Sequence, residues 1–200
     1  RGGASAVAQV WPGTNFDPSA ALRGLGGTVK IASPLCEFLS EQQLLGAMSS
    51  ELESMPGKIQ FGISLYGATG KIGVGHKPQA WGIELKKLLK QAGRSVRHVR
   101  GTGPALSSAT VTHNNLHTTG REFIVLAQPA GKFSLGATAA VQPFMEWSER
   151  DYGRPGRDDK SGMLPPKLAL IMVNLAQAPL DDVVLDPFCG TGTTALVCAE

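Results

Sequence analysis

Val183–Glu200, VVLDPFCGTGTTALVCAE, predicts a buried strand, a glycine-rich turn and the first residues of a helix. The run Val183–Leu185 is short, apolar and partly β-branched, which is typical of a parallel strand covered on both faces. Gly190 and Gly192 lack Cβ atoms, so their backbone can turn sharply and come close to a ligand. A helix can begin at Thr193, and its first N–H groups favour an anion. This order predicts the beginning of a doubly wound α/β domain.

The residues of the turn separate the ligand classes that use such a structure. A P-loop requires a Lys after its second glycine, and Thr193 stands there instead, which disfavours nucleoside triphosphate hydrolysis. A dinucleotide fingerprint is matched by Gly190, Gly192 and Ala195, but it also needs an acidic residue about 20 positions further on. A purely structural interpretation is also open, in which Asp186 caps the helix and the glycines make a tight turn.

The block D-P-F-C-G-T-G-T, residues 186–193, resembles the cofactor motif of the S-adenosylmethionine-dependent amino-methyltransferases, which act on exocyclic amines of nucleic-acid bases. The resemblance implies that Asp186 and the turn around Gly190 and Gly192 hold the methionine end of the cofactor. Upstream, S-G-M-L-P-P-K-L-A, residues 161–169, resembles the helix that precedes the cofactor strand in these enzymes. The cofactor-binding residues implied in this way are Ser161, Gly162, Met163, Pro165, Asp186, Pro187, Phe188, Cys189, Gly190, Thr191, Gly192 and Thr193.

The helix expected after Pro165 and Pro166 also has a simpler interpretation. Proline suits the start of a helix, where its missing N–H would have no partner in any case. The apolar residues that follow recur at helical spacing and predict one packing face: Leu168, Ile171, Met172 and Leu175. Asn174 interrupts the run, which is too short to span a bilayer, so we expect a core helix with no membrane role.

Motif order distinguishes the methyltransferase groups that share this arrangement. Some DNA amino-methyltransferases place a catalytic Pro-Pro-aromatic loop upstream of the cofactor motif, but here the one Pro-Pro pair is followed by Lys167. We therefore name no catalytic residue and expect the catalytic loop downstream. This order is similar to that of the THUMP-domain RNA guanine-N2 methyltransferases. Three further segments resemble members related to the tRNA guanine-10 enzymes: residues 25–32, 61–67 and 141–155.

The resemblance implies an S-adenosylmethionine-dependent enzyme that methylates the exocyclic N2 amine of a guanine in tRNA, of which this chain is an N-terminal fragment that is inactive by itself. Three alternatives stay open: a ribosomal RNA or DNA amino-methyltransferase, a non-catalytic RNA-binding module, and a dinucleotide-binding oxidoreductase. The sequence does not decide whether a small activator subunit is needed.

The predicted fold class is α/β: an α+β, THUMP-like N-terminal part followed by the beginning of a Rossmann-like domain. We divide the chain into a partial ferredoxin-like region (1–55), a THUMP-like RNA-binding region (56–140), a linker (141–163) and the incomplete methyltransferase domain (164–200). The expected strands are 28–32, 59–66, 95–100 and 122–127. The expected helices are 40–55, with Ser40 and Gln43 as a capping box, and 79–91, ending near Gly93.

A basic cluster stands out although the formal net charge is only +3. Its members fall within fifteen residues that contain no acid: Lys86, Lys87, Lys90, Arg94, Arg97 and Arg100. A phosphate backbone would relieve their mutual repulsion, and a solvated helix face is an equally good interpretation of the charges alone. The THUMP resemblance favours RNA as the partner.

Composition sets further limits. A chain with 42% hydrophobic and 18% charged residues can bury an ordinary globular core. The three cysteines show no C-x-x-C spacing, which is typical of a reducing, cytoplasmic compartment. The four histidines have no metal-ligand spacing with cysteine, so no metal site is expected.

Overall fold

The computed structural model describes residues 15–67, 77–154, 162–177, 179 and 182–199. They divide into two units, one holding Lys30–Val141 and the other holding Phe16–Val29 with Gln142–Glu200. The first unit contains β1 (Lys30–Leu39), α2 (Glu41–Glu53), β2 (Ile59–Tyr66), α3 (Lys77–Gln91), β3 (Val96–Val99), α4 (Ser108–His113), β4 (Arg121–Ala127), the short helix η2 (Pro129–Gly131) and β5 (Phe133–Val141). The second contains α1 (Pro18–Arg23), α5 (Phe144–Ser148), the π-helical turn η3 (Glu149–Gly153), α6 (Pro166–Ala176) and α7 (Thr193–Cys198).

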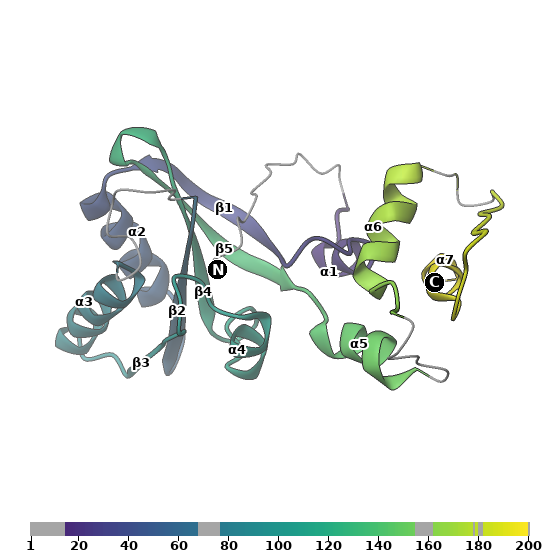
Figure 1. Ribbon diagram of the computed structural model, residues 1–200. Coiled ribbons are helices and arrows are strands. Elements are labelled where there is room, and N and C mark those ends of the chain that lie inside the picture. The colour runs from purple at the N-terminus through teal and green to yellow at the C-terminus, as the bar shows by residue number, and fades with distance from the viewer. Residues whose placement is uncertain (1–14, 68–76, 155–161, 178, 180–181, 200) are drawn as a thin grey trace. The chain divides into compact units, whose positions relative to one another are not determined.

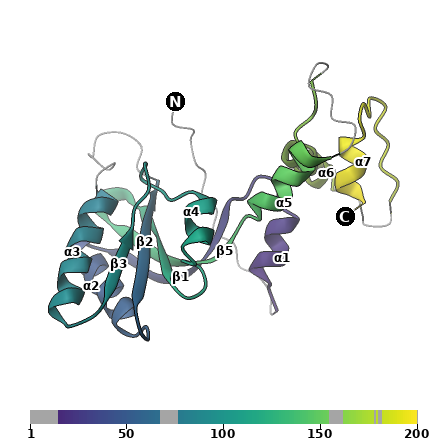
Figure 2. The same ribbon diagram turned by 90° about the horizontal axis from the view of Figure 1, so that it is seen from below.

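The first unit is built on a five-stranded mixed sheet in the order β1-β5-β4-β2-β3. Strand β2 runs parallel to β3 and β4, whereas β5 runs antiparallel to both β4 and β1. Helices α2 and α3 cover one face of this sheet, and α4 lies on the other (Figures 1 and 2). The predicted α/β class is therefore confirmed.

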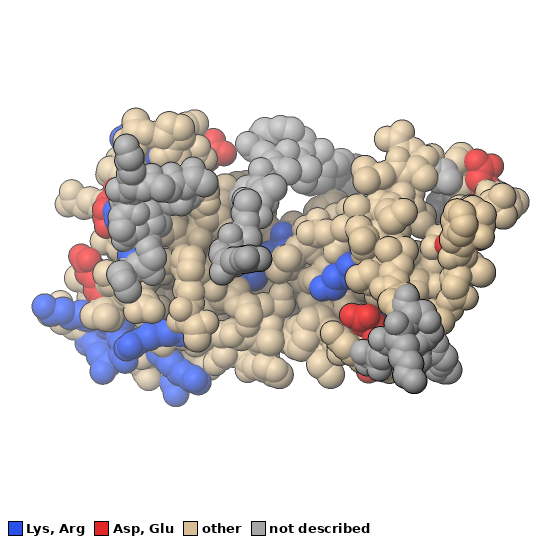
Figure 3. Space-filling model, viewed as in Figure 1, with Lys and Arg blue, Asp and Glu red and all other residues tan. Residues whose placement is uncertain are grey.

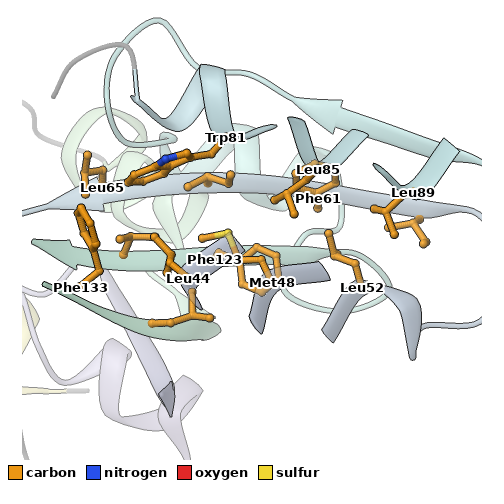
Figure 4. Packing of buried hydrophobic residues seen from close by; sticks show 14 of the residues in the cluster. Leu44, Met48, Leu52, Phe61, Leu65, Trp81, Leu85, Leu89, Phe123 and Phe133 are labelled. Carbon is orange, nitrogen blue, oxygen red and sulfur yellow. The ribbon is translucent and has the colours of Figure 1, made fainter. Parts of the chain in front are cut away.

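The main core lies between the sheet and helices α2 and α3, and its residues follow the two periodicities of strand and helix. Alternate residues of β2 point into it, and residues four apart on each helix meet them (Figure 4). These side chains are Phe61, Ile63 and Leu65 on β2, Leu44, Met48 and Leu52 on α2, and Trp81, Leu85 and Leu89 on α3. Each fully buried side chain of this size contributes about 1.5–3 kcal/mol.

Local signals place several elements where the sequence predicts them. Ser40 caps α2, and Gln43 completes the predicted capping box: its backbone N–H donates to the Ser40 hydroxyl and its side-chain oxygen accepts from the Ser40 N–H. Strand β2 has the predicted bounds, and α3 begins two residues earlier than expected. Gly93 follows α3 with a φ of +76°, the left-handed conformation that glycine adopts without strain.

Other elements differ from the prediction. The strand expected at 28–32 begins at Lys30 and runs on to Leu39, with bulges on either side of Pro34. A proline is tolerated there because β1 is an edge strand. The strand expected at Val183–Leu185 does not form, which corrects our prediction: none of the described residues pairs with it, and a parallel strand needs neighbouring strands to satisfy its backbone. No helix in the described part is long and apolar enough to cross a membrane.

A buried polar network joins four strands of the sheet. Glu122 on β4 is fully buried and accepts hydrogen bonds from the hydroxyls of Ser64 on β2 (2.5 Å) and Thr138 on β5 (2.6 Å). Lys30 on β1 forms an ion pair with the same carboxylate and also donates to the carbonyl of Leu106 (2.8 Å). Burial lowers the pKa of Lys30, and the neighbouring Glu122 charge opposes this shift. The network therefore leaves neither ion of the buried pair without a partner.

Candidate functional site

The glycine-rich turn before α7 has the backbone geometry that its sequence predicts. Gly190 has a φ of +50° and Gly192 a φ of +78°, and Gly192 is the N-cap residue of α7. A Cβ added at Gly192 would meet nothing within 4 Å, and one at Gly190 would meet only the Phe188 carbonyl oxygen at 3.9 Å. The side of the turn where these side chains would stand is thus open, so the backbone fits the close approach of a cofactor.

Asp186 braces the turn from its first residue. One of its carboxylate oxygens accepts a hydrogen bond from the Phe188 N–H at 2.9 Å. Hydrogen bonds from the Thr194 hydroxyl and from that N–H lower the pKa of Asp186, so the carboxylate is charged at neutral pH. Asp186 therefore does not cap α7, whose N-cap residue is Gly192; it bonds to residues of the turn and places a negative charge beside it.

Arg154 contacts the same turn and was not among the predicted site residues. Its Nη2 donates a hydrogen bond to the Thr191 hydroxyl at 3.2 Å, across 37 positions of the chain. Arg154 belongs to a connector in which arginines alternate with aspartates, a pattern that usually indicates surface ion pairs. The sequence pattern could not predict the contact with Thr191, because the two residues are far apart in the sequence and meet only in the folded chain.

The start of α6 carries the other predicted cofactor residues. Gly162, Met163 and Pro165 are described, whereas Ser161 lies outside the described residues. The Pro165 carbonyl accepts the first turn's hydrogen bonds, and the Lys167 ammonium donates to the side-chain oxygen of Gln142 at 2.6 Å. Helices α6 and α7 pack against each other, so the two predicted segments lie in one unit.

Apolar side chains around the turn are uncovered. Val183 is 95% exposed, Leu185 is 85% exposed and Phe188 is 91% exposed. Side chains of this kind normally pack against neighbouring strands and helices in a doubly wound domain. The turn is therefore formed locally, by Asp186 and its own backbone, without a surrounding pocket of described residues.

The predicted basic cluster lies on α3 and β3 and the residues beside them, where Figure 3 shows Lys and Arg side chains gathered at the lower left. Lys87, Lys90 and Arg100 are exposed, and Lys86 is half-buried. Arg94 is engaged elsewhere, because its guanidinium donates to the carbonyl oxygens of Glu53 (2.7 Å) and Met55 at the end of α2. Its charge stays in the cluster, but its side chain is fixed by the fold.

His98 shows how closely part of the cluster converges. Its ring stacks on Phe61, with centroids 5.0 Å apart, and packs against Gly82 of α3. Burial, followed by the positive charges of Arg100 and Lys86, lowers the pKa of His98 to about 4. The charges of Arg100 and Lys86 therefore both act on the His98 ring and disfavour its protonation.

Arg97 does not share that face. Strand residues alternate between faces, and the neighbouring His98 packs on the α3 side. Arg97 therefore points to the α4 side of β3, next to Gln60 in the register of β2. The cluster predicted as one set wraps around the edge of the sheet.

Comparison with known proteins relates these features to a family. Residues 154–199 match the family described as RMKL-like, methyltransferase domain. This segment is therefore similar to a methyltransferase domain. The match begins at Arg154, the residue that contacts the glycine-rich turn, and includes α6, the turn and α7.

Two relatives extend the comparison. A tRNA (guanine(10)-N2)-dimethyltransferase from Methanocaldococcus jannaschii is 42% identical over 60 residues, which are 28% of this chain and 17% of that protein. The crystal structure of TrmN from Thermus thermophilus aligns with a TM-score of 0.49 and 21% identity, covering 96% of this chain and 50% of the other. The chain thus spans half or less of the length of these relatives.

Proposed function

We propose that this chain is part of an S-adenosylmethionine-dependent RNA methyltransferase that methylates the exocyclic N2 amine of a guanine in tRNA. The observation that carries the proposal is the open glycine turn, braced by Asp186, within the segment that matches a methyltransferase domain. The tRNA guanine specificity of the Methanocaldococcus jannaschii relative supports the choice of substrate.

In this proposal the chain binds and orients the cofactor, which supplies an electrophilic methyl group on its sulfonium. The turn residues Gly190, Thr191 and Gly192 would hold the methionine end by close backbone approach, together with the start of α6. The guanine would be flipped out of its stack so that its amine lies in line with that methyl, and most of the rate would come from positioning. We assign no catalytic residue within the chain.

The basic cluster would bind the RNA backbone. Lys86, Lys87 and Lys90 have no ion-pair partner in the described part of the chain, so they are available for phosphates. Phosphate contacts position an RNA without reading its sequence, and they release counterions on binding. The cluster is therefore proposed to supply affinity, and the methyltransferase domain to supply specificity.

The cofactor assignment is tested by Gly192→Val in the full-length protein. A β-branched side chain at a φ of +78° is strained and stands on the open side of the turn, so we expect S-adenosylmethionine binding to be lost in calorimetry. Gly57→Val is the matched control, because Gly57 also has a positive φ (+68°) and open space around it but lies in the other unit. Equal affinity in the Gly192 variant and the parent would refute the assignment.

The RNA assignment is tested by changing Lys86, Lys90 and Arg97 together to Gln. We expect weaker tRNA binding and a flatter dependence of affinity on salt, by about 0.7–0.9 in the logarithmic slope for each phosphate that the variant no longer neutralises. Cofactor affinity should not change. A control that removes the same charge outside the cluster changes Arg23, Lys77 and Lys132 to Gln. If both triple variants bind tRNA with the parent's affinity and salt slope, the cluster is only a solvated surface.

A further inference from the structure

We propose that Arg154 binds the carboxylate at the amino-acid end of S-adenosylmethionine. This inference rests on the proposed function and assigns a residue of the connector to the cofactor site. Arg154 is held at the turn by its hydrogen bond to the Thr191 hydroxyl, and Thr191 stands between the two open glycines. The guanidinium is thereby fixed next to the backbone that the cofactor would approach.

The Arg154 guanidinium has N–H donors that no described residue accepts. Arginine presents five N–H donors in a planar fork, and one of them is used for Thr191. Its Nε is buried and has no hydrogen-bond acceptor among the described residues. A carboxylate matches this fork with two parallel, charge-assisted hydrogen bonds, which are roughly twice as strong as neutral ones.

The charges on the two sides of the turn complement an amino acid. The amino-acid end of the cofactor carries both an ammonium and a carboxylate, so a site that recognises it needs charges of both signs. Asp186, with its lowered pKa, supplies the negative charge at the residues before Gly190. Arg154 supplies the positive charge at Thr191. We therefore assign the cofactor carboxylate to Arg154, and we expect the cofactor ammonium to lie near the Asp186 carboxylate.

A simpler role for Arg154 would be to brace the turn, and the two roles differ in their dependence on the ligand. S-adenosylhomocysteine carries the carboxylate, whereas its decarboxylated analogue, S-adenosyl-3-thiopropylamine, keeps the nucleoside, the chain and the ammonium and lacks only the carboxylate. If Arg154 binds the carboxylate, its removal weakens binding of the first ligand selectively. If Arg154 only shapes the turn, its removal weakens binding of both ligands by the same factor.

The experiment measures both affinities by calorimetry with the full-length protein. Arg154→Gln should weaken S-adenosylhomocysteine binding by about ten- to hundredfold, as expected for the removal of hydrogen bonds between charged groups, and should leave the affinity for S-adenosyl-3-thiopropylamine within about twofold. Arg154→Lys, which keeps the charge but not the fork, should fall between the parent and the Gln variant. Arg23→Gln removes the same charge from an exposed position in the same unit and should change neither affinity.

Two results would overturn the role of Arg154: an equal decrease in affinity for both ligands in the Gln variant, or no decrease for either. A parent protein that binds neither ligand would instead overturn the cofactor assignment itself, and the role of Arg154 with it. The parent's own affinities therefore separate a failure of the proposed function from a failure of this inference.

Discussion

Glu122→Gln is expected to destabilise the sheet unit more than the removal of any exposed ion pair. The substitution keeps the shape of the side chain but removes the charge that balances Lys30. Glu122 is fully buried and the Lys30 side chain is only 6% exposed, so water cannot replace the missing charge. The Ser64 and Thr138 hydroxyls would also face an amide that accepts through only one of its atoms.

The magnitude follows from the burial of the pair. Removing one partner of a buried ion pair costs about 3–5 kcal/mol, because the other charge is left uncompensated. The Leu106 carbonyl still accepts from Lys30 at 2.8 Å, so we expect a destabilisation near the lower limit, about 3 kcal/mol. Since whole domains are stable by about 5–15 kcal/mol, this is a large fraction of the total.

Urea denaturation, followed by circular dichroism, measures this destabilisation. Lys77→Gln is the control, since the pair of Lys77 with Glu41 (2.9 Å) is partly exposed and should contribute less than about 1 kcal/mol. In the Glu122 variant the folded-state pKa of Lys30, already lowered by burial, should fall further below its unfolded value of about 10.4. The unfolded state then binds more protons, so the variant should regain stability relative to the parent as pH rises toward about 10. Two results would refute this reasoning: a Glu122→Gln destabilisation no larger than that of Lys77→Gln, or a difference in unfolding free energy between the Glu122 variant and the parent that does not become smaller as pH rises.

Two further predictions concern the contact between α3 and β3. Gly82→Ala should lower Tm although alanine favours a helix, because the new Cβ would lie 2.0 Å from Cε1 of His98. Gly46→Ala is the control: its new Cβ would meet nothing within 4 Å, so this variant should raise Tm. The folded-state pKa of His98, about 4, lies below its ordinary value of about 6.5, so its contribution to stability is complete above about pH 6.5 and is lost as pH falls toward 4. Thermal unfolding of the parent and of His98→Gln between pH 4 and 7 should show a smaller decline in the variant, and parallel declines would contradict the assignment.

The elements that the sequence predicted best are those whose determinants are local. The capping box at Ser40 needs only residues three apart, and the left-handed turn at Gly93 needs only one. Strand β2 was recognised because it is apolar almost throughout and bounded by polar residues. In contrast, strand β5 was not predicted. The turn between β4 and β5 contains Ala130 at a φ of +60°, and an alanine gives no sequence signal for this left-handed conformation.

The candidate site shows the same division between local and distant determinants. Asp186, Gly190 and Gly192 could be recognised because the turn is closed by bonds within a few residues, and it forms here although the adjoining strand does not. Arg154 could not be recognised, because its bond to Thr191 depends on how the connector returns to the turn. The strand at Val183–Leu185 lies between these cases: its apolar sequence is suited to a sheet, but its backbone can be satisfied only by neighbouring strands, which the described residues do not provide. The turn is therefore the part of the proposed cofactor site that this chain forms from its own neighbouring residues, and Arg154 is a side chain from outside the turn that the fold already holds in place.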